Sequence, residues 1–437
     1  MALTAAAMRG FEAESMCVVM VRRECSAFLR DERRCESVCL NPIRMKLSLP
    51  VAGSVAAKAT PLTALWTFPS VLFSAFLVAW GAEAAQFLVS QGLALAILAW
   101  LQTLPEFAVE AVIAWEAGKD PAKVHLAIAN FTGSIRLLVG LGWPLVYFVA
   151  AFFARKTGRR GTWIAITFDD EHAIEIVGLL PPLLWFTVIW WKGTLGLLDA
   201  AILAACYVAY LAALLRVPAR EGDVEEMEDL PAVSRWALAR GPRRRGWAIA
   251  GIFLVGGAIL AVSAHAFVES MLALAISAGV SQFVFVQWVA PFLSEFPEKL
   301  SAFNWARQIT KAPMAVMNLV SSTINQWSIL SALIPVIYSI SKGTPSAIAF
   351  DQHQRLEILL TILQSFLGWL LLVNLDLRAF EAATLFVFWL IQFAVPSMRG
   401  PMIGVYAGWC GVEIAMIAMG KRQPRAFRAA WNTLRRR

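Results

Sequence analysis

The chain has 437 residues, of which 59% are hydrophobic and only 16% are charged. Soluble globular domains are about 45–50% apolar and about 25% charged, so this composition excludes an ordinary soluble fold. The formal net charge of +8 does not indicate nucleic-acid binding, because the basic residues lie between and after apolar runs. Many of these runs reach about 20 residues, which is long enough to cross a bilayer.

The apolar runs predict an all-α polytopic membrane protein with eleven spanning helices. In chain order, the expected helices cover residues 63–84, 87–115, 122–153, 172–191, 194–215, 246–276, 280–305, 313–340, 355–375, 379–396 and 400–420.

The basic residues predict how these helices are oriented. Basic clusters follow the third, fifth, seventh and eleventh spans; residues 216–246 carry seven Arg, and residues 421–437 carry seven Lys or Arg and no acid. Basic loops favour the cytoplasmic side. Eleven spans that start outside place all four clusters there, so we expect a multi-pass protein of the cell inner (plasma) membrane.

The chain divides into five expected segments. They are a disordered N-terminal extension (1–60), a first transmembrane half (61–215), a cytoplasmic charged linker (216–245), a second half (246–396), and an extra transmembrane helix with a basic cytoplasmic tail (397–437).

The two halves contain an internal repeat. Thr103-Leu104-Pro105-Glu106 precedes Asn130 and Ser134, and Ser294-Glu295-Phe296-Pro297-Glu298 precedes Asn318 and Ser322. The second span runs outward and the seventh runs inward, so the predicted fold has two inverted five-helix repeats plus one C-terminal helix. Inverted repeats place the ion site of many transporters near the membrane midplane.

The repeated residues predict a cation site. Proline removes a backbone donor and frees a carbonyl beside each carboxylate. Thr103 and Glu106 share one helix face, as do Ser294 and Glu298. Hard oxygen ligands with two negative charges suit Ca²⁺ better than a soft metal. Charged groups at membrane depth are functional candidates; the alternative is that both glutamates are solvated near helix ends.

These motifs resemble the two alpha-repeats of the sodium/calcium exchanger superfamily, and the resemblance covers about residues 64–395. The family pattern is roughly Gly-Thr-Ser-Leu-Pro-Glu, followed by Gly-Asn-x-x-Gly-Ser-Asn. A divergent prokaryotic member is indicated. The resemblance implies that Glu106 and Glu298 are the central Ca²⁺ ligands and that the first helices of the two halves slide to alternate access. The residues that would complete the Ca²⁺ and Na⁺ sites are Thr103, Asn130, Ser134, Ser294, Asn318 and Ser322.

Several residues depart from the family pattern. The Asn that closes Gly-Ser-Asn is replaced by Ile135 in the first copy and by Thr323 in the second. Glu110, Arg136 and Glu295 add charges and are expected to modulate the site. We predict that Glu110 pairs with Arg136, an arrangement that keeps both in the membrane at low cost. Crowded carboxylates share protons, which favours proton coupling.

The predicted function is secondary active antiport of Ca²⁺, or a similar cation, against Na⁺ or H⁺ by alternating access. No enzymatic chemistry, catalytic residue or cofactor is predicted, and the expected partners are inorganic cations and the lipid bilayer. Two alternatives stay open: a sodium/proton-type exchanger on the same scaffold, and a non-transporting sensor or scaffold with a degenerate ion site.

Overall fold

The computed structural model describes residues 60–85, 87, 100, 103–156, 165–216, 230–279 and 281–435. They belong to one compact unit that runs from Lys58 to Arg437. The predicted N-terminal extension, apart from Thr60, and residues 217–229 of the predicted linker lie outside the described residues.

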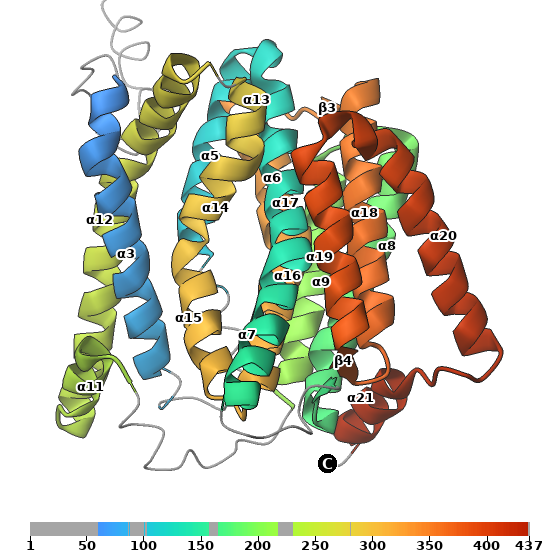
Figure 1. Cartoon of the computed structure of the whole chain (residues 1–437). Coiled ribbons are helices and arrows are strands. Elements are labelled where there is room, and N and C mark those ends of the chain that lie inside the picture. The colour runs from blue at the N-terminus through green and yellow to red at the C-terminus, as the bar shows by residue number, and fades with distance from the viewer. Residues whose placement is uncertain are drawn as a thin grey trace, which may run out of the picture. The chain divides into compact units, whose positions relative to one another are not determined.

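The described chain is almost entirely helical (Figure 1). The first half contains η1 (Pro61–Thr63), α3 (Ala64–Ala85), α5 (Leu104–Lys119), η2 (Pro121–Lys123), α6 (Val124–Leu137), η3 (Leu138–Gly142), α7 (Trp143–Lys156), β1 (Ala165–Thr167), η5 (Asp170–His172), α8 (Ala173–Lys192), β2 (Thr194–Leu195) and α9 (Leu197–Leu214). After α11 (Ala232–Leu238), the second half contains α12 (Pro242–Ser277), α13 (Gln282–Val284), η6 (Phe285–Val289), α14 (Ala290–Ser294), α15 (Phe296–Arg307), α16 (Ala312–Asn325), η7 (Gln326–Leu330), α17 (Ser331–Lys342), β3 (Ile348–Ala349), α18 (Gln352–Leu372), β4 (Asp376–Arg378) and α19 (Ala379–Ala394). The chain continues through η8 (Pro396–Met398), α20 (Arg399–Ala418) and α21 (Arg425–Arg435).

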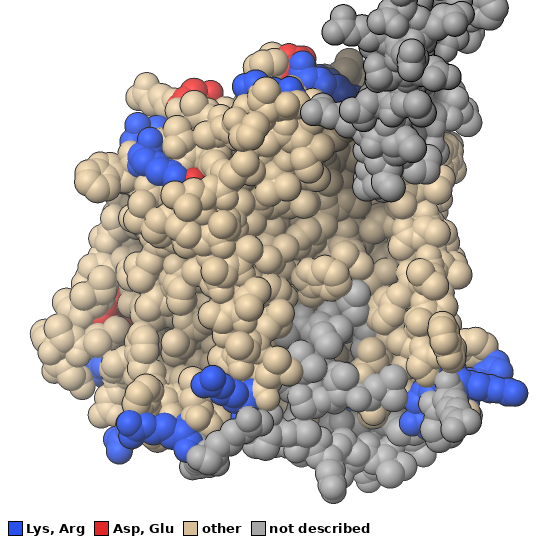
Figure 2. All heavy atoms as spheres, turned by 180° about the vertical axis from the view of Figure 1, so that it is seen from behind, with Lys and Arg blue, Asp and Glu red and all other residues tan. Residues whose placement is uncertain are grey.

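The predicted polytopic membrane fold is confirmed. In the described part of the chain, eight helices are long and apolar enough to cross a membrane, and they coincide with eight of the eleven predicted spans. Figure 2 shows most Lys, Arg, Asp and Glu side chains near the two ends of the face in view, separated by a broad band with few charges. Such a band is what a bilayer core requires.

The other three predicted spans differ from a single long helix. The second lies partly outside the described residues, and its described part is α5. The seventh is divided into α13, η6, α14 and α15, with a break at Glu295, whose φ of −92° and ψ of 2° are not helical. The tenth, α19, has 16 residues. A broken helix is tolerated at membrane depth where protein surrounds the freed backbone groups.

Two short antiparallel sheets establish that the halves are inverted. Strand β1, which connects α7 to α8, pairs with β4, which connects α18 to α19. Strand β2, which connects α8 to α9, pairs with β3, which connects α17 to α18. In each sheet, the strand that follows the third spanning segment of one half pairs with the strand that follows the fourth spanning segment of the other half. These two connections therefore lie on the same side of the membrane. This pairing requires opposite orientations of the two halves.

The π-helical turns follow the same internal symmetry. In each half the helix that carries the repeated Asn passes into a π turn eight residues after it, from Asn130 to Leu138 and from Asn318 to Gln326. Single π turns inside α-helices are rare and occur frequently at functional sites. Their matched positions show that the two copies share local backbone geometry as well as sequence.

The described end of the predicted linker packs against the first half. Residues 230–241 include α11, whose Ala237 and Leu238 are buried. Ser234 of this helix donates to the Trp80 carbonyl of α3 at 2.9 Å. Helix α12 begins at Pro242, four residues before the predicted start. The apolar side chains of α11 supply this packing, which a reading based on charge alone overlooks.

Candidate functional site

The repeated Pro-Glu motifs begin new helices at the centre of the protein. Thr103 is the N-cap residue of α5 and Glu295 that of α15, and each proline is the second residue of its helix. Proline is well tolerated in a first helical turn, where its missing N–H has no intrahelical partner. Glu106 and Glu298 therefore lie in the first turns of their helices, where the helix dipole favours a negative charge.

One hydroxyl joins carboxylates from the two halves. Ser134 of α6 is within hydrogen-bond contact of Glu106 on α5 and of Glu295 between α14 and α15. All three side chains are buried. A hydroxyl has one proton and can donate to only one acceptor at a time. Two carboxylates that converge on it therefore need a further donor or a cation between them.

Two amides of the second half complete this contact. Gln326 Nε2, which carries two protons, lies within hydrogen-bond distance of three acceptors: Glu106 Oε2 at 2.6 Å, and Ser134 Oγ and Glu295 Oε1 at 2.9 Å. Asn325 Nδ2 donates to Thr103 Oγ1 at 2.5 Å. Sequence reasoning missed both amides. Their signal is that two adjacent amide side chains stand within the eighth predicted span, seven and eight residues after Asn318.

Glu298 is fully buried, so the alternative of a solvated glutamate is wrong; Glu106 is also only 1% exposed. Among the described residues, neither oxygen of Glu298 accepts a hydrogen bond. The Ser322 hydroxyl lies beside this carboxylate without a hydrogen bond of regular geometry. A buried carboxylate without a donor is costly unless it holds a proton or a cation.

Further buried oxygens carry no donor within the described ranges. They are Glu110 Oε1, Asn130 Oδ1, Asn325 Oδ1 and Gln326 Oε1. The NH₂ group of each of these amides is already used, by Glu110, by Thr103 and by the cluster around Ser134. The carbonyl oxygens of these amides remain available as acceptors, and hard cations such as Ca²⁺ take such oxygen ligands.

The other predicted residues are distributed as follows. Asn318 is buried on α16. The Ser294 hydroxyl donates to the Pro291 carbonyl at 3.2 Å, within its own helix. The described residues contain no group of three or more His, Cys, Asp and Glu side chains that could hold a metal ion. A cation at this centre would therefore need hydroxyl and amide oxygens in addition to carboxylates.

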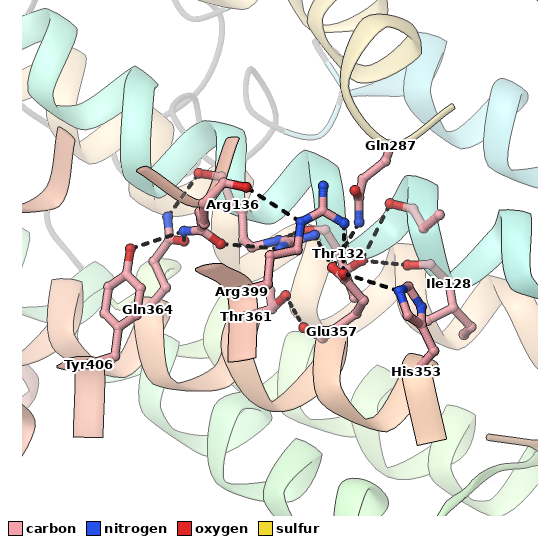
Figure 3. A network of polar contacts seen from close by, with 12 residues as sticks. Ile128, Thr132, Arg136, Gln287, His353, Glu357, Thr361, Gln364, Arg399 and Tyr406 are labelled. Atoms are coloured by element: carbon pink, nitrogen blue, oxygen red, sulfur yellow. Dashed lines mark hydrogen bonds and ion pairs between the residues drawn. The ribbon is translucent and has the colours of Figure 1, made fainter. Parts of the chain in front are cut away.

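The predicted pair between Glu110 and Arg136 is wrong. Glu110 accepts from Asn130 at 2.6 Å. Arg136 instead forms a buried ion pair with Glu357 of α18 and lies over the Trp288 ring, with its guanidinium carbon 4.9 Å from the ring centroid. Figure 3 shows that Arg136 belongs to a separate polar network.

This network joins the extra C-terminal helix to the rest of the protein. Glu357 also accepts from Arg399 at the start of α20, at 2.9 Å, and from Gln287 of η6, at 2.8 Å. Arg136 donates to Gln392 of α19 at 3.2 Å. Glu357 and Arg399 were not predicted, although both are charges within or beside apolar runs.

Comparisons with known proteins show the family of the chain and its fold. Residues 58–216 and 248–397 match the model of the family described as sodium/calcium exchanger protein. The crystal structure of the H⁺/Ca²⁺ exchanger CAX is 30% identical, covers 86% of this chain and 92% of its own, and gives a TM-score of 0.77.

The sodium-calcium exchanger NCX_Mj, soaked with Na⁺ and Sr²⁺, is 16% identical, covers 77% of this chain and 99% of its own, and gives a TM-score of 0.52. This second likeness concerns the fold alone. No curated protein matches the chain. The two matched segments of the family model correspond to the two inverted halves, and the chain belongs to the sodium/calcium exchanger family.

Proposed function

We propose that the protein is a secondary active antiporter of the cell inner membrane that exchanges Ca²⁺, or a cation of similar chemistry, for H⁺. The observation that carries the proposal is the convergence of Glu106 and Glu295 on the Ser134 hydroxyl, with the buried Glu298 close by. Membership of an exchanger family supports transport rather than enzymatic chemistry. The cargo ions are the substrates, and no resident cofactor is needed.

Proton coupling is favoured over Na⁺ coupling by what occupies the position of the missing family asparagines. Ile135 is buried in the hydrophobic core and offers no oxygen. The Thr323 hydroxyl donates to the Leu319 carbonyl of its own helix at 2.8 Å. Glu295 adds a carboxylate to the centre, and closely spaced carboxylates cannot all ionise at once. The site therefore lacks side-chain oxygens for Na⁺ at these two positions but has carboxylates that can bind H⁺, which supports H⁺ as the coupling ion.

Alternating access is proposed to use the first helices of the two halves. Helices α3 and α12 lie side by side (Figure 1) and contact each other through small polar groups. The Thr67 and Ser270 hydroxyls are 2.9 Å apart, and Ser74 donates to the Gly256 carbonyl at 2.7 Å. Small side chains at a helix interface permit close approach and sliding in a membrane.

The test is Ca²⁺ uptake by protein in proteoliposomes, driven separately by an outward H⁺ gradient and by an outward Na⁺ gradient. We expect the H⁺ gradient to drive uptake, and Glu106→Gln to abolish it. Glu116→Gln is the matched control, because Glu116 lies on the same helix but pairs with Lys119 and Lys123 at its exposed end. Uptake driven only by Na⁺ would contradict the coupling ion proposed.

A monovalent-cation exchanger on the same scaffold is the second candidate. It is favoured by Lys299, whose ammonium binds Glu295 and reduces the negative charge that a divalent ion would meet. The same proteoliposomes distinguish the two, because H⁺-driven uptake of Na⁺ without uptake of Ca²⁺ supports the monovalent exchanger. Folded protein that moves neither ion supports a non-transporting scaffold.

A further inference from the structure

A lysine is bound to one of the carboxylates of the candidate cation site. Lys299 Nζ forms an ion pair with Glu295 Oε2, one helical turn earlier on the chain. Lys299 is 5% exposed and Glu295 is 1% exposed. A buried ammonium at membrane depth is rare and is a functional candidate in its own right. The antiport mechanism proposed above makes no use of it.

Comparison of the two copies of the repeat shows that Glu295 and Lys299 are both specific to the second copy. When Thr103-Leu104-Pro105-Glu106 is matched with Glu295-Phe296-Pro297-Glu298, Glu295 takes the position of Thr103, and Lys299 takes the position of Phe107. In the first copy the Thr103 hydroxyl bonds to an amide. The second copy therefore adds a carboxylate and a tethered positive charge, with no change in net charge.

The added carboxylate reaches the centre of the site through its other oxygen. Glu295 Oε2 binds Lys299, while Oε1 contacts Ser134 and Gln326, which also hold Glu106. The ammonium is thus separated from the shared Ser134 contact by a single carboxylate group. It interacts with Glu298, its neighbour in the chain, as well.

Among the described residues, no other buried base pairs with a carboxylate of this centre. Helix α16, which packs against α15, has no charged residue between Ala312 and Asn325. The basic residues of α7 that the structure describes, Arg155 and Lys156, lie in its last turn. Arg136 of α6 is also buried, but it pairs with Glu357 in the separate network. Glu106, Glu110 and Glu298 are buried acids of the same helices α5 and α15.

We propose that the Lys299 ammonium is a built-in monovalent cation, which occupies beside Glu295 the place that a free monovalent cation would otherwise take. The inference rests on the proposed cation antiport. An ammonium group carries the same charge as Na⁺ or K⁺, and all three are stabilised by oxygen ligands. Because the ammonium is tethered, divalent-cation binding does not depend on a monovalent co-ion, and Lys299 sets which ions the site accepts.

The proposal predicts that removal of the ammonium creates a site for a free monovalent cation. We would measure the thermal unfolding midpoint of the detergent-purified full chain while NH₄⁺, K⁺ or Na⁺ replaces choline at constant ionic strength. The Lys299→Ala variant should gain at least about 2 °C from one of these ions, because a ligand that binds only the folded state stabilises it. The wild type and Lys299→Arg should gain nothing.

Lys342→Ala is the matched control, because it removes an exposed lysine at the end of α17, and it should also gain nothing. A Lys299→Ala protein whose midpoint is as insensitive as that of the wild type to all three ions overturns the proposal, since a merely structural ion pair leaves no such site. If the alanine variant does not purify as folded protein, Lys299→Gln carries the same test.

The outcome is separable from that of the antiport proposal. Stabilisation of the wild type by Ca²⁺ tests divalent binding, whereas stabilisation of Lys299→Ala by a monovalent ion requires no divalent binding or transport. In proteoliposomes the variant should take up Ca²⁺ only when the ion that stabilises it is present. Uptake at the wild-type rate with choline as the only other cation would contradict the role of Lys299.

Discussion

Gln326 donates a hydrogen bond to Glu106 at 2.6 Å across a separation of 220 residues. The acceptor lies in the first turn of α5 in the first half, and the donor begins the π turn η7 of the second half. The matching position in the first half is Leu138, which starts the other π turn. The two halves are therefore similar in backbone but not in chemistry, because only the second half supplies an amide that holds the carboxylates of both.

Gln326→Leu should weaken divalent-cation binding. The substitution introduces the side chain that the first half carries and removes donors from Glu106, Glu295 and Ser134. Loss of a partner that orients a metal ligand typically costs about 10- to 100-fold in affinity. The measurement is the Ca²⁺ concentration that gives half-maximal uptake. Gln308→Leu, at an exposed position after α15, is the control, and an unchanged half-maximal concentration in Gln326→Leu would contradict the role assigned to the amide.

Gly133→Ala should strongly destabilise the fold. Gly133 lies between Asn130 and Ser134 on α6, and a Cβ atom there would be 1.8 Å from the Gln287 backbone oxygen of η6. A backbone group cannot move aside as a flexible side chain can, and overpacking typically costs about 1–3 kcal/mol or more. The measurement is the thermal unfolding midpoint of the purified protein.

Gly142→Ala is the appropriate comparison for this substitution. Gly142 ends the adjacent π turn, and its added Cβ would approach no atom closer than 3.4 Å. We expect its midpoint to stay near that of the wild type. Equal destabilisation by the two alanines would mean that loss of glycine flexibility, rather than the close approach of α6 and η6, is responsible.

Glu357→Leu should cost more stability than Arg136→Leu. Glu357 lies between two buried guanidinium groups, those of Arg136 and Arg399. Its removal leaves two buried cations without a carboxylate, whereas removal of Arg136 leaves a neutral pair. Breaking a buried ion pair typically costs about 3–5 kcal/mol, and we expect the glutamate variant to reach this range.

Limited proteolysis of α20 provides a second measurement beside the thermal midpoints, because Arg399 connects α20 to Glu357 of α18. Glu357→Leu should release this helix to protease earlier than Arg136→Leu does. An Arg136→Leu protein that is the less stable of the two would show that the contacts of Arg136 with Gln392 and Trp288 matter more than the charge balance.

The sequence was sufficient to predict eight of the eleven spans and the position of Glu106 and Glu298 inside the protein, because hydropathy reports membrane crossing directly and Pro-Glu occurs in both halves. It was not sufficient to predict the partner of Arg136. Arg136 follows Ser134 by two residues, which rotates it by roughly 200° around the helix and away from the carboxylates. Glu110 and Arg136 lie on consecutive helices, and for this reason a pair was predicted. The rotation of α6 about its axis, however, decides which residue each one contacts.

Gln326 and Lys299 were missed for a different reason. A search for repeated residues selects positions that are alike in both copies, and these two positions are Leu138 and Phe107 in the first half. The side chains that make the site asymmetric are therefore the ones that such a search discards. They become visible only when the two helices are placed against each other, as the contacts of Gln326 with Glu106 and Glu295 show.

Glu110 should act by positioning Asn130 rather than as a charged ligand. Asn130 Nδ2 donates to Glu110 Oε2 at 2.6 Å, which leaves Asn130 Oδ1 without a donor among the described side chains. In Glu110→Gln the amide oxygen can still accept this hydrogen bond, so the half-maximal Ca²⁺ concentration should stay near the wild-type value. Glu110→Leu removes the acceptor and should raise it by about 10- to 100-fold. Loss of uptake in Glu110→Gln, to the extent expected for Glu106→Gln, would instead make the Glu110 charge itself part of the cation site.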